Sequence, residues 1–421
     1  MSHSLQEADA HAPLIRARRM GIDTYQEPVA FMRADCHVCR SEGFQVQARV
    51  KVSAGERSVI ATLNVVSESL LPLDEAGLSE AAWRELRTRD GDALEFAHPE
   101  PLQSFSNVRR KIYGLELEPE AYLDVVRDIV AGRYSHIELA AFLTTCAGDR
   151  MSLNEVVSLT RAMAAAGSTL SWPSNLVVDK HCIGGLPGNR TTPIVVAIAA
   201  AAGLTMPKTS SRAITSPAGT ADVMETLAPV ALDLPAMRRV VEQEGGCIVW
   251  GGAMDLSPAD DILIQVERPL DFDSDGQLVA SVLSKKLAAG STHVVIDVPV
   301  GPTAKVRSQS AAKKLIDKLT FVGTAVGLEI RAVETAGMEP VGAGIGPALE
   351  ARDVVAVLKG EKSAPSDLRE RALRLAAEVL RIGRKVTGEG IAEATRYLDS
   401  GEAWRKFQAI CEAQGGVRMP P

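Results

Sequence analysis

The sequence has little of what marks secreted, membrane-spanning or nucleic-acid-binding proteins. Aromatic residues make up 4% of its 421 residues, and a net charge of −7 argues against broad binding to nucleic acids or membrane surfaces. The N-terminal segment mixes charged and small residues and contains no apolar signal-peptide core. The longest apolar stretch, residues 193–204, is too short to span a bilayer and predicts a buried helix. We therefore expect a cytoplasmic protein.

Cysteine is also scarce. The six cysteines are scattered along the chain, and no spacing predicts a disulfide framework. Cys36 and Cys39 have the spacing of half a zinc site, but no second Cys or His pair follows at finger spacing. We interpret them as ordinary thiols on a turn and expect neither a metal nor a cofactor.

The chain does have two loops rich in glycine and hydroxyl residues, 179–192 and 208–220, each followed by an apolar stretch. Neither loop contains the dinucleotide fingerprint or the Walker motif. Glycines let backbone N–H groups approach an anion, hydroxyls donate hydrogen bonds, and a following helix directs its positive end at the ligand. Lys180 and Arg212 add positive charge. The two loops therefore predict a phosphate site.

Two residues of the first loop belong to types that serve in catalysis. A histidine such as His181 is more often packed or hydrogen-bonded than a general base, and we interpret it so. The neighbours of Cys182 would equally suit a serine hydroxyl, so we do not expect it to act as a nucleophile.

The N-terminal half of the chain changes from strand to helix patterns. Residues 45–52 alternate with period two and residues 59–66 are apolar and β-branched, which predicts a small β-rich domain. Capping-box patterns at 135–138 and 152–155 predict a helical layer from about 106 to 170.

Strands and helices alternate in the remainder. Strands expected at 175–179, 248–250 and 293–298 are separated by loops and helices, which predicts an α/β core with ligand sites at the strand ends. Residues 364–416 have helical patterns. On their own residues, 268–277 would be a solvated acidic turn or a cation site, and 281–286 an exposed helical face.

Several of these segments together resemble one family, the thymidine and pyrimidine-nucleoside phosphorylases. The resemblance is specific for the family and less so for the substrate, and it covers roughly residues 12–416. The strings 187–189 and 208–216 are most similar to the second subfamily, which includes the archaeal AMP phosphorylases and bacterial proteins named after thymidine phosphorylase. The matching motifs are Asp179-Lys180-His181-x-x-Gly184-Gly185, Ser210-x-Arg212, Gly219-Thr220-x-Asp222 and Ala280-Ser281-Val282-Leu283-Ser284-Lys285-Lys286.

The resemblance implies an α/β fold with a helical domain and a mixed α/β domain, preceded by the β-rich domain. We expect the β-rich domain at 1–105, the helical domain at 106–172 with 257–290 returning to it, and the α/β phosphate-binding domain at 173–256 and 291–421. The family's chains continue beyond Gly416 into a further β-rich domain, so we expect that domain to be absent or removed here.

The resemblance also implies the chemistry, which is phosphorolysis of an N-glycosidic bond by inorganic phosphate as co-substrate. Asp273 matches the proton donor of the AMP phosphorylases. The positions that match phosphate ligands are Lys180, Cys182, Thr192, Ser210 and Thr220, with Cys182 standing where a serine is usual. The positions that match nucleotide or base ligands are Gly185, Ser211, Arg212, Ala213, Ile214, Thr215, Ser216, Thr220, Ser281, Lys285 and Lys305.

A departure from the family bears on the substrate. Thymidine phosphorylases hold the base with an arginine, and Val266 stands at that position here, two residues from Arg268. We therefore expect phosphorolysis of a nucleoside 5′-monophosphate such as AMP to give base and ribose 1,5-bisphosphate, by a homodimer or larger homo-oligomer with small-molecule partners alone. The alternatives are a thymidine or uridine phosphorylase, a magnesium-dependent phosphoribosyltransferase that resembles the anthranilate enzyme, and a non-catalytic nucleotide-binding protein.

Overall fold

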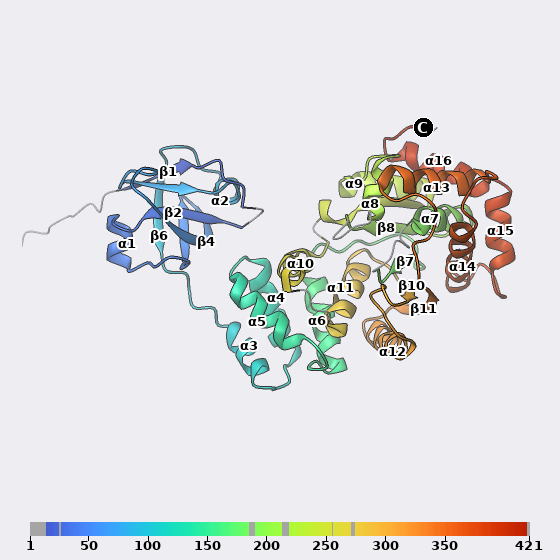
Figure 1. Ribbon diagram of the computed structural model, residues 1–421, viewed down its shortest axis with the longest axis horizontal. Helices are drawn as coiled ribbons and strands as arrows, with labels where there is room; N and C mark the ends of the chain where they lie inside the picture. The colour runs from blue at the N-terminus through green and yellow to red at the C-terminus, as the bar shows by residue number, and fades with distance from the viewer. Residues whose placement is uncertain are drawn as a thin grey trace, which may run out of the picture. The chain divides into compact units, whose positions relative to one another are not determined.

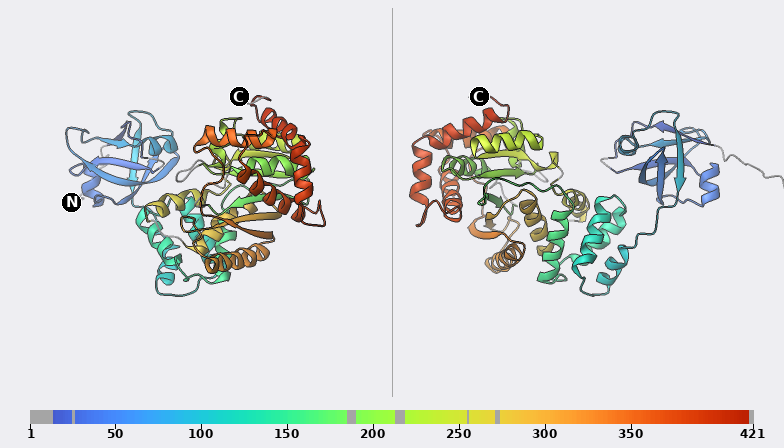
Figure 2. Two further views of the ribbon diagram at one scale, coloured as in Figure 1. Left: turned by 45° about the vertical axis from the view of Figure 1, so that its right-hand side comes forward. Right: turned by 180° about the vertical axis from the view of Figure 1, so that it is seen from behind.

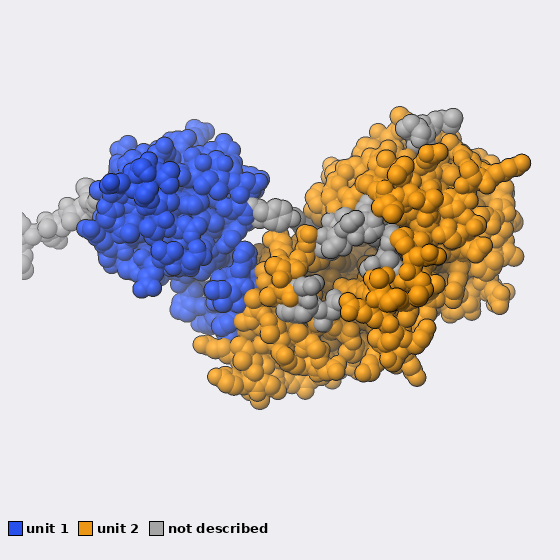
Figure 3. All heavy atoms as spheres, viewed as in Figure 1, with its two compact units in different colours: residues 1–106, 131–139 blue, residues 107–130, 140–421 orange. Residues whose placement is uncertain are grey.

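The computed structural model describes residues 14–24, 27–184, 190–212, 219–254, 256–270 and 274–418. Figure 3 colours the two compact units into which the chain divides: unit 1 holds residues 1–106 and 131–139, and unit 2 holds residues 107–130 and 140–421. Each unit has its own hydrophobic core. Among the described residues, no helix combines the length and the apolar character needed to cross a membrane.

Unit 1 is a β-barrel (Figure 1). The barrel is closed, and its strands have the order β1-β5-β2-β4-β3-β6. In β3, Val50 and Val52 are buried whereas Lys51 between them is exposed, as the period-two pattern predicts. This strand begins later than expected, because the Ala48 N–H donates to the Gln45 carbonyl (3.0 Å) and closes a turn there. The elements are β1 (Ile15–Arg19), β2 (Val29–Arg33), α1 (His37–Glu42), β3 (Arg49–Ala54), β4 (Arg57–Val66), β5 (Glu75–Leu78), α2 (Glu80–Leu86) and β6 (Ala93–Ala97).

Unit 2 combines helices with parallel strands. Its first helices are α3 (Phe105–Ile112), α4 (Pro119–Val130), α5 (His136–Cys146) and α6 (Leu153–Ala165). Helix α5 begins in unit 1 and ends in unit 2. The following elements alternate: β7 (Val178–Cys182), α7 (Thr191–Ala201), β8 (Met206–Ser210), α8 (Thr220–Glu225), α9 (Leu234–Glu244), β9 (Gly246–Trp250), a 3-10 turn (Gly251–Ala253), α10 (Pro258–Leu270), α11 (Asp275–Ala288), β10 (His293–Val300), α12 (Gln309–Ala325) and β11 (Glu329–Ala336). The chain then forms α13 (Pro347–Lys359), α14 (Ser366–Ile382), α15 (Ile391–Asp399) and α16 (Glu402–Ala413).

The strands of unit 2 form parallel sheets with helices on both faces (Figure 1 and Figure 2). One sheet has the order β11-β10-β7, and β8 pairs with β9 in another. Alternate residues of β10 enter different cores: Val295 packs with α7 and α14, whereas Val294 and Ile296 pack with α6, α11 and α12. This arrangement is the expected α/β fold with a helical part, and the fold-class prediction is confirmed.

Helix α7 is the apolar stretch that the sequence predicts to be buried. Its residues from Thr191 to Ala200 are all buried, because strands and other helices surround it. Gly203, with a φ of 75°, follows the helix in the left-handed conformation that ends helices readily. The first turn of α7 is therefore held in place, and its residues Thr191 and Thr192 lie beside β7.

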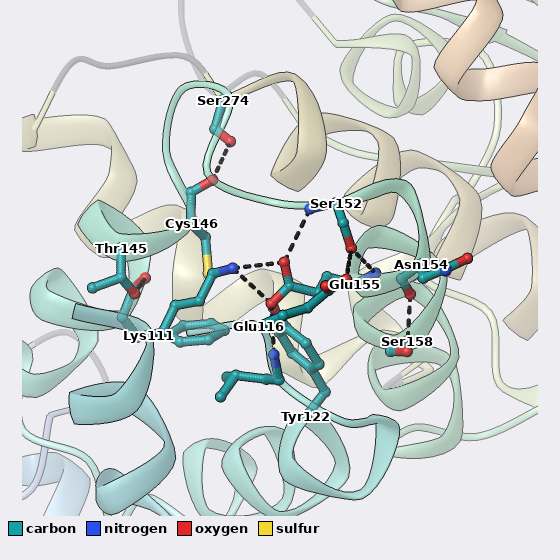
Figure 4. A network of polar contacts seen from close by, with 12 residues as sticks. Lys111, Glu116, Tyr122, Thr145, Cys146, Ser152, Asn154, Glu155, Ser158 and Ser274 are labelled. Atoms are coloured by element: carbon teal, nitrogen blue, oxygen red, sulfur yellow. Dashed lines mark hydrogen bonds and ion pairs between the residues drawn. The ribbon is translucent and has the colours of Figure 1, made fainter. Parts of the chain in front are cut away.

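A buried carboxylate holds the helical part of unit 2 together (Figure 4). Ser152 and Glu155 form the predicted capping box of α6. Both oxygens of Glu155 also accept from the Lys111 ammonium (2.6 Å each), and one accepts from the Tyr122 hydroxyl (3.0 Å) and the Leu117 N–H (2.9 Å). Burial would raise the pKa of Glu155, but Lys111 and the other donors hold it below its ordinary value.

We expect Lys111→Met to lower the free energy of unfolding by about 3–5 kcal/mol, because it leaves the buried Glu155 carboxylate without its counter-charge. The measurement is urea denaturation near neutral pH. Since the pKa of Glu155 is depressed in the folded state, the loss should be full above its ordinary value of 4.5 and shrink as the pH falls through the folded pKa.

A surface pair provides the control. Arg127 and Asp124 form an exposed ion pair on α4, so Arg127→Ala should change stability by about 0.5 kcal/mol or less. A Lys111→Met protein as stable as the wild type would show that Glu155 needs no ammonium partner.

Candidate phosphate and nucleotide site

Part of the predicted site lies outside the described residues. These residues are Gly185, Ala213, Ile214, Thr215, Ser216 and the expected proton donor Asp273. The remaining candidates lie at the carboxyl ends of β7, β8 and β10, in α7 and α8, and in α11. Among the described residues, no group of His, Cys, Asp or Glu side chains is placed to hold a metal ion.

Strand β7 places Lys180 against the start of α7. The Lys180 ammonium donates to the hydroxyls of Thr191 (2.9 Å) and Thr192 (3.3 Å), and its side chain is fully buried. It forms no ion pair with any carboxylate among the described residues. The structure thus brings together two of the expected phosphate ligands, Lys180 and Thr192, at the positive end of a helix.

Cys182 follows on the same face of β7 as Lys180, because side chains alternate along a strand. Burial and the nearby charge of Asp297 raise the pKa of the Cys182 thiol to about 12. The thiol is therefore protonated at neutral pH. It can donate only a weak hydrogen bond to an anion.

The other expected phosphate ligands lie on the second loop. Ser210 ends β8, and its buried hydroxyl has no hydrogen-bond partner among the described residues. Ser211 follows and is exposed, whereas Thr220, at the start of α8, is buried. An orphaned buried hydroxyl such as that of Ser210 is suited to donate to a ligand.

The side chain of Asp179 points toward α11, away from the side chain of Lys180. Its carboxylate accepts from the Lys286 ammonium (2.7 Å), lies 3.3 Å from the Lys208 ammonium, and accepts from the Lys180 backbone N–H (2.6 Å). Burial would raise its pKa, but the charges of Lys208 and Lys286 bring it below the ordinary value. Burial and the neighbouring lysines also lower the pKa of His181 well below its usual range, so its imidazole is neutral.

Arg212 is already engaged by acidic side chains. Its guanidinium donates to both oxygens of Glu225 (2.5 and 2.8 Å), contacts Asp222 at 3.2 Å, and lies 4.9 Å from the ring centre of Trp250. A phosphate at Arg212 would therefore replace or share these carboxylates.

The expected base-binding pair lies on helix α11. The Lys285 ammonium donates to the Ser281 hydroxyl (3.1 Å) and to Asp260 of α10 (2.6 Å), so it is held by a buried carboxylate that the sequence did not indicate. Val266 is buried in α10 and Arg268 is exposed. Residues two apart on a helix do not share a face, so Arg268 does not replace the arginine expected at Val266.

Lys305 lies in a tight turn after β10. The Gly301 N–H donates to the Val306 carbonyl (3.1 Å) and closes this turn, and Lys305 is exposed in it. A Cβ on Gly301 would lie 2.1 Å from the carbonyl oxygen of Gly337, which follows β11. Close approach of these backbones therefore requires glycine and fixes the place of Lys305.

Sequence reasoning missed Asp260 and the cluster of Asp179, Lys208 and Lys286. Taken by itself, the pair of lysines at 285–286 predicts that residues 281–286 form an exposed helical face. Lys286 is 2% exposed, so this interpretation of residues 281–286 is wrong. A signal was available in hindsight: Asp179 lies in an apolar strand and must have a positive partner once buried.

Family models match most of unit 2. Residues 107–167 match the helical bundle domain of a glycosyl transferase family, and residues 174–404 match the a/b domain of that family. The chain is also similar to solved structures of anthranilate phosphoribosyltransferase. That of Thermus thermophilus is 21% identical with a TM-score of 0.61, covering 73% of this chain and 99% of that one. That of Saccharomyces cerevisiae is 15% identical with a TM-score of 0.59, covering 74% and 98%.

Curated relatives are more similar still. A protein of Polaromonas sp. strain JS666 named "Putative thymidine phosphorylase" is 63% identical over 97% of this chain and 80% of its own length. "Putative thymidine phosphorylase 1" of Acidovorax sp. strain JS42 is 61% identical over the whole chain and 82% of its own length. The chain therefore belongs to the glycosyl transferase family that holds these thymidine phosphorylase relatives, and it is an enzyme of the pentosyltransferase type.

Proposed function

We propose that the enzyme cleaves a nucleoside 5′-monophosphate with inorganic phosphate. A phosphate oxygen forms a bond to C1′ of the ribose, the N-glycosidic bond breaks, and its electron pair leaves with the base. The products are the free base and ribose 1,5-bisphosphate. The observation that carries the proposal is the buried Lys180 ammonium, which has hydroxyl partners but, among the described residues, no carboxylate partner and so retains a positive charge for an anion.

Each reactant has suitable groups in the described part of the site. Lys180, Thr192 and the orphaned Ser210 hydroxyl suit inorganic phosphate, which must be held still for attack. Ser281 and Lys285, fixed by Asp260, suit the base. Asp273 would donate the proton that the leaving base takes up.

Two cations, Lys305 and Arg212, support the proposal that the substrate carries a 5′-phosphate. Lys305 is exposed in a turn beyond β10, and Arg212 is held in a partly exposed ion pair that another anion can displace. A neutral nucleoside needs neither cation. Val266 also leaves the site without the base-binding arginine expected of thymidine phosphorylases. Thymidine phosphorolysis remains the second candidate, because the curated relatives carry that name.

The direct test is a phosphorolysis assay with AMP, CMP, UMP and thymidine, with and without phosphate. We expect kcat/KM for the preferred monophosphate to exceed that for its nucleoside about 10- to 100-fold, since charge-assisted hydrogen bonds contribute ~1.5–3 kcal/mol. Lys305→Met should remove much of that preference and leave nucleoside turnover unchanged. Equal or better turnover of thymidine would contradict the monophosphate proposal.

Asp273→Asn tests the proton donor. If Asp273 protonates the leaving base, the substitution should lower kcat by ~10²–10⁴ while nucleotide binding persists. Steady-state kinetics together with a nucleotide-binding titration separate these effects. A near-normal kcat would show that Asp273 is a solvated turn residue.

Cys182→Ser should strengthen phosphate binding, because a hydroxyl donates a better hydrogen bond than a thiol. A gain of ~1 kcal/mol corresponds to a fall in the phosphate KM of about 5-fold. Cys411→Ser, at a buried cysteine of α16, is the matched control and should leave the phosphate KM as it is. If both variants behave alike, Cys182 contributes no ligand.

A further inference from the structure

The parallel strands of unit 2 separate between β7 and β8, and the gap holds a cluster of charged side chains. An isolated bridge joins Val177 to Thr205 where the two strands begin, and the Val178 N–H donates to the Thr205 carbonyl (2.9 Å). Beyond this point β7 pairs with β10 and β8 pairs with β9. The strands therefore start together and then part.

Side chains satisfy backbone groups where the strands part. The Lys180 N–H donates to the Asp179 carboxylate (2.6 Å), and the Lys208 ammonium donates to the Thr209 carbonyl (2.7 Å). Lys286 completes the cluster from α11. Asp179, Lys208 and Lys286 are each at most 5% exposed, so water does not screen their charges.

The cluster connects the two halves of the proposed site. On β7, the side chain of Asp179 faces the cluster and that of Lys180 faces α7. On α11, Lys285 lies one turn after Ser281, and its ammonium donates to the Ser281 hydroxyl. Lys286 is the next residue, so its side chain points to another side of the helix and reaches Asp179 of β7. The ion pair between Lys286 and Asp179 thus ties the helix expected to bind the base to the strand expected to bind phosphate.

We propose that Asp179, Lys208 and Lys286 are positioning residues, which fix the backbone at Lys180 and hold α11 against β7 so that phosphate and nucleotide are bound in register. This inference rests on the proposed function in one respect, the assignment of Lys180 as a phosphate ligand. The cluster itself does not need to touch either substrate.

The charge of the cluster gives a second consequence, a pH dependence. Two ammonium groups, those of Lys286 and Lys208, lie against the single Asp179 carboxylate, so the cluster carries excess positive charge near the phosphate ligand. Burial, opposed by Asp179 and reinforced by Lys208, lowers the pKa of Lys286 to about 7. An anion on Lys180 favours protonated Lys286, so phosphate affinity should fall as the pH rises through that range.

Few other charged or titratable groups bear on Lys286. His181 on β7 is neutral, and burial raises the pKa of the Cys247 thiol on β9 so that it stays protonated. Lys285 is paired with Asp260 of α10. The titration expected in this pH range is therefore that of Lys286, together with that of phosphate itself.

Calorimetric titration with inorganic phosphate from about pH 6 to about pH 9 tests the proposal. Lys286→Met should weaken phosphate binding about 10-fold at the acid end and less at the alkaline end, because the wild-type lysine is neutral there. Phosphate's own titration is common to both proteins and cancels from their ratio. Lys406→Met, which removes a lysine paired with Glu244 on distant helices, is the control and should follow the wild type at every pH.

A second variant guards against failure to fold. Asp179→Asn combined with Lys286→Met removes both charges of the pair and leaves no unpaired carboxylate. If the residues act as a unit, the double variant should bind phosphate no worse than the weaker single variant. The proposal would be overturned if the losses of phosphate affinity in the two single variants added up in the double variant. It would also be overturned if Lys286→Met bound phosphate as tightly as the wild type, or if the ratio of their affinities did not depend on pH.

Lys180→Met separates this inference from the function on which it rests. If Lys180→Met binds phosphate normally, the assignment of the phosphate site is wrong. If Lys180→Met loses phosphate while Lys286→Met keeps it, the phosphate site stands and the positioning role of the cluster is wrong.

Discussion

The burial of Asp179 is the constraint on which the site depends. A carboxylate in a water-free interior is stable only beside positive charge and hydrogen-bond donors. Here those partners come from β8 and α11, and from the next residue of β7 itself. Elements that are far apart in the sequence must therefore meet beside β7, where Lys180 is then placed against the first turn of α7.

Simple periodicities separate the roles of neighbouring residues. On β7, alternation directs Asp179 to the cluster and Lys180 to α7, and on α11 a rotation of about 100° per residue directs Lys285 and Lys286 to different partners. Each pair of adjacent residues thus contributes one group to structure and one to the proposed site.

Local patterns predicted the fold well, because strand and helix periodicities reflect which face is buried. The buried helix after the first loop, the capping box at Ser152 and the α/β alternation all follow from neighbouring residues. Ion pairs between distant segments follow from tertiary packing alone. The sequence could therefore not indicate that Lys286 is buried, that Asp260 holds Lys285, or that Glu225 holds Arg212.

The cations assigned to the two phosphate groups differ in their surroundings. Lys180 is buried and has only hydroxyl partners among its described contacts, so its charge is ready for inorganic phosphate. The Arg212 side chain is 37% exposed and is already bonded to carboxylates, so a 5′-phosphate proposed to bind there would replace or share Glu225. Because an exposed ion pair contributes only ~0–1 kcal/mol, that exchange costs little. Under the proposed function, the phosphate co-substrate would therefore meet a preorganised site, whereas binding of the nucleotide would rearrange the charges around its 5′-phosphate.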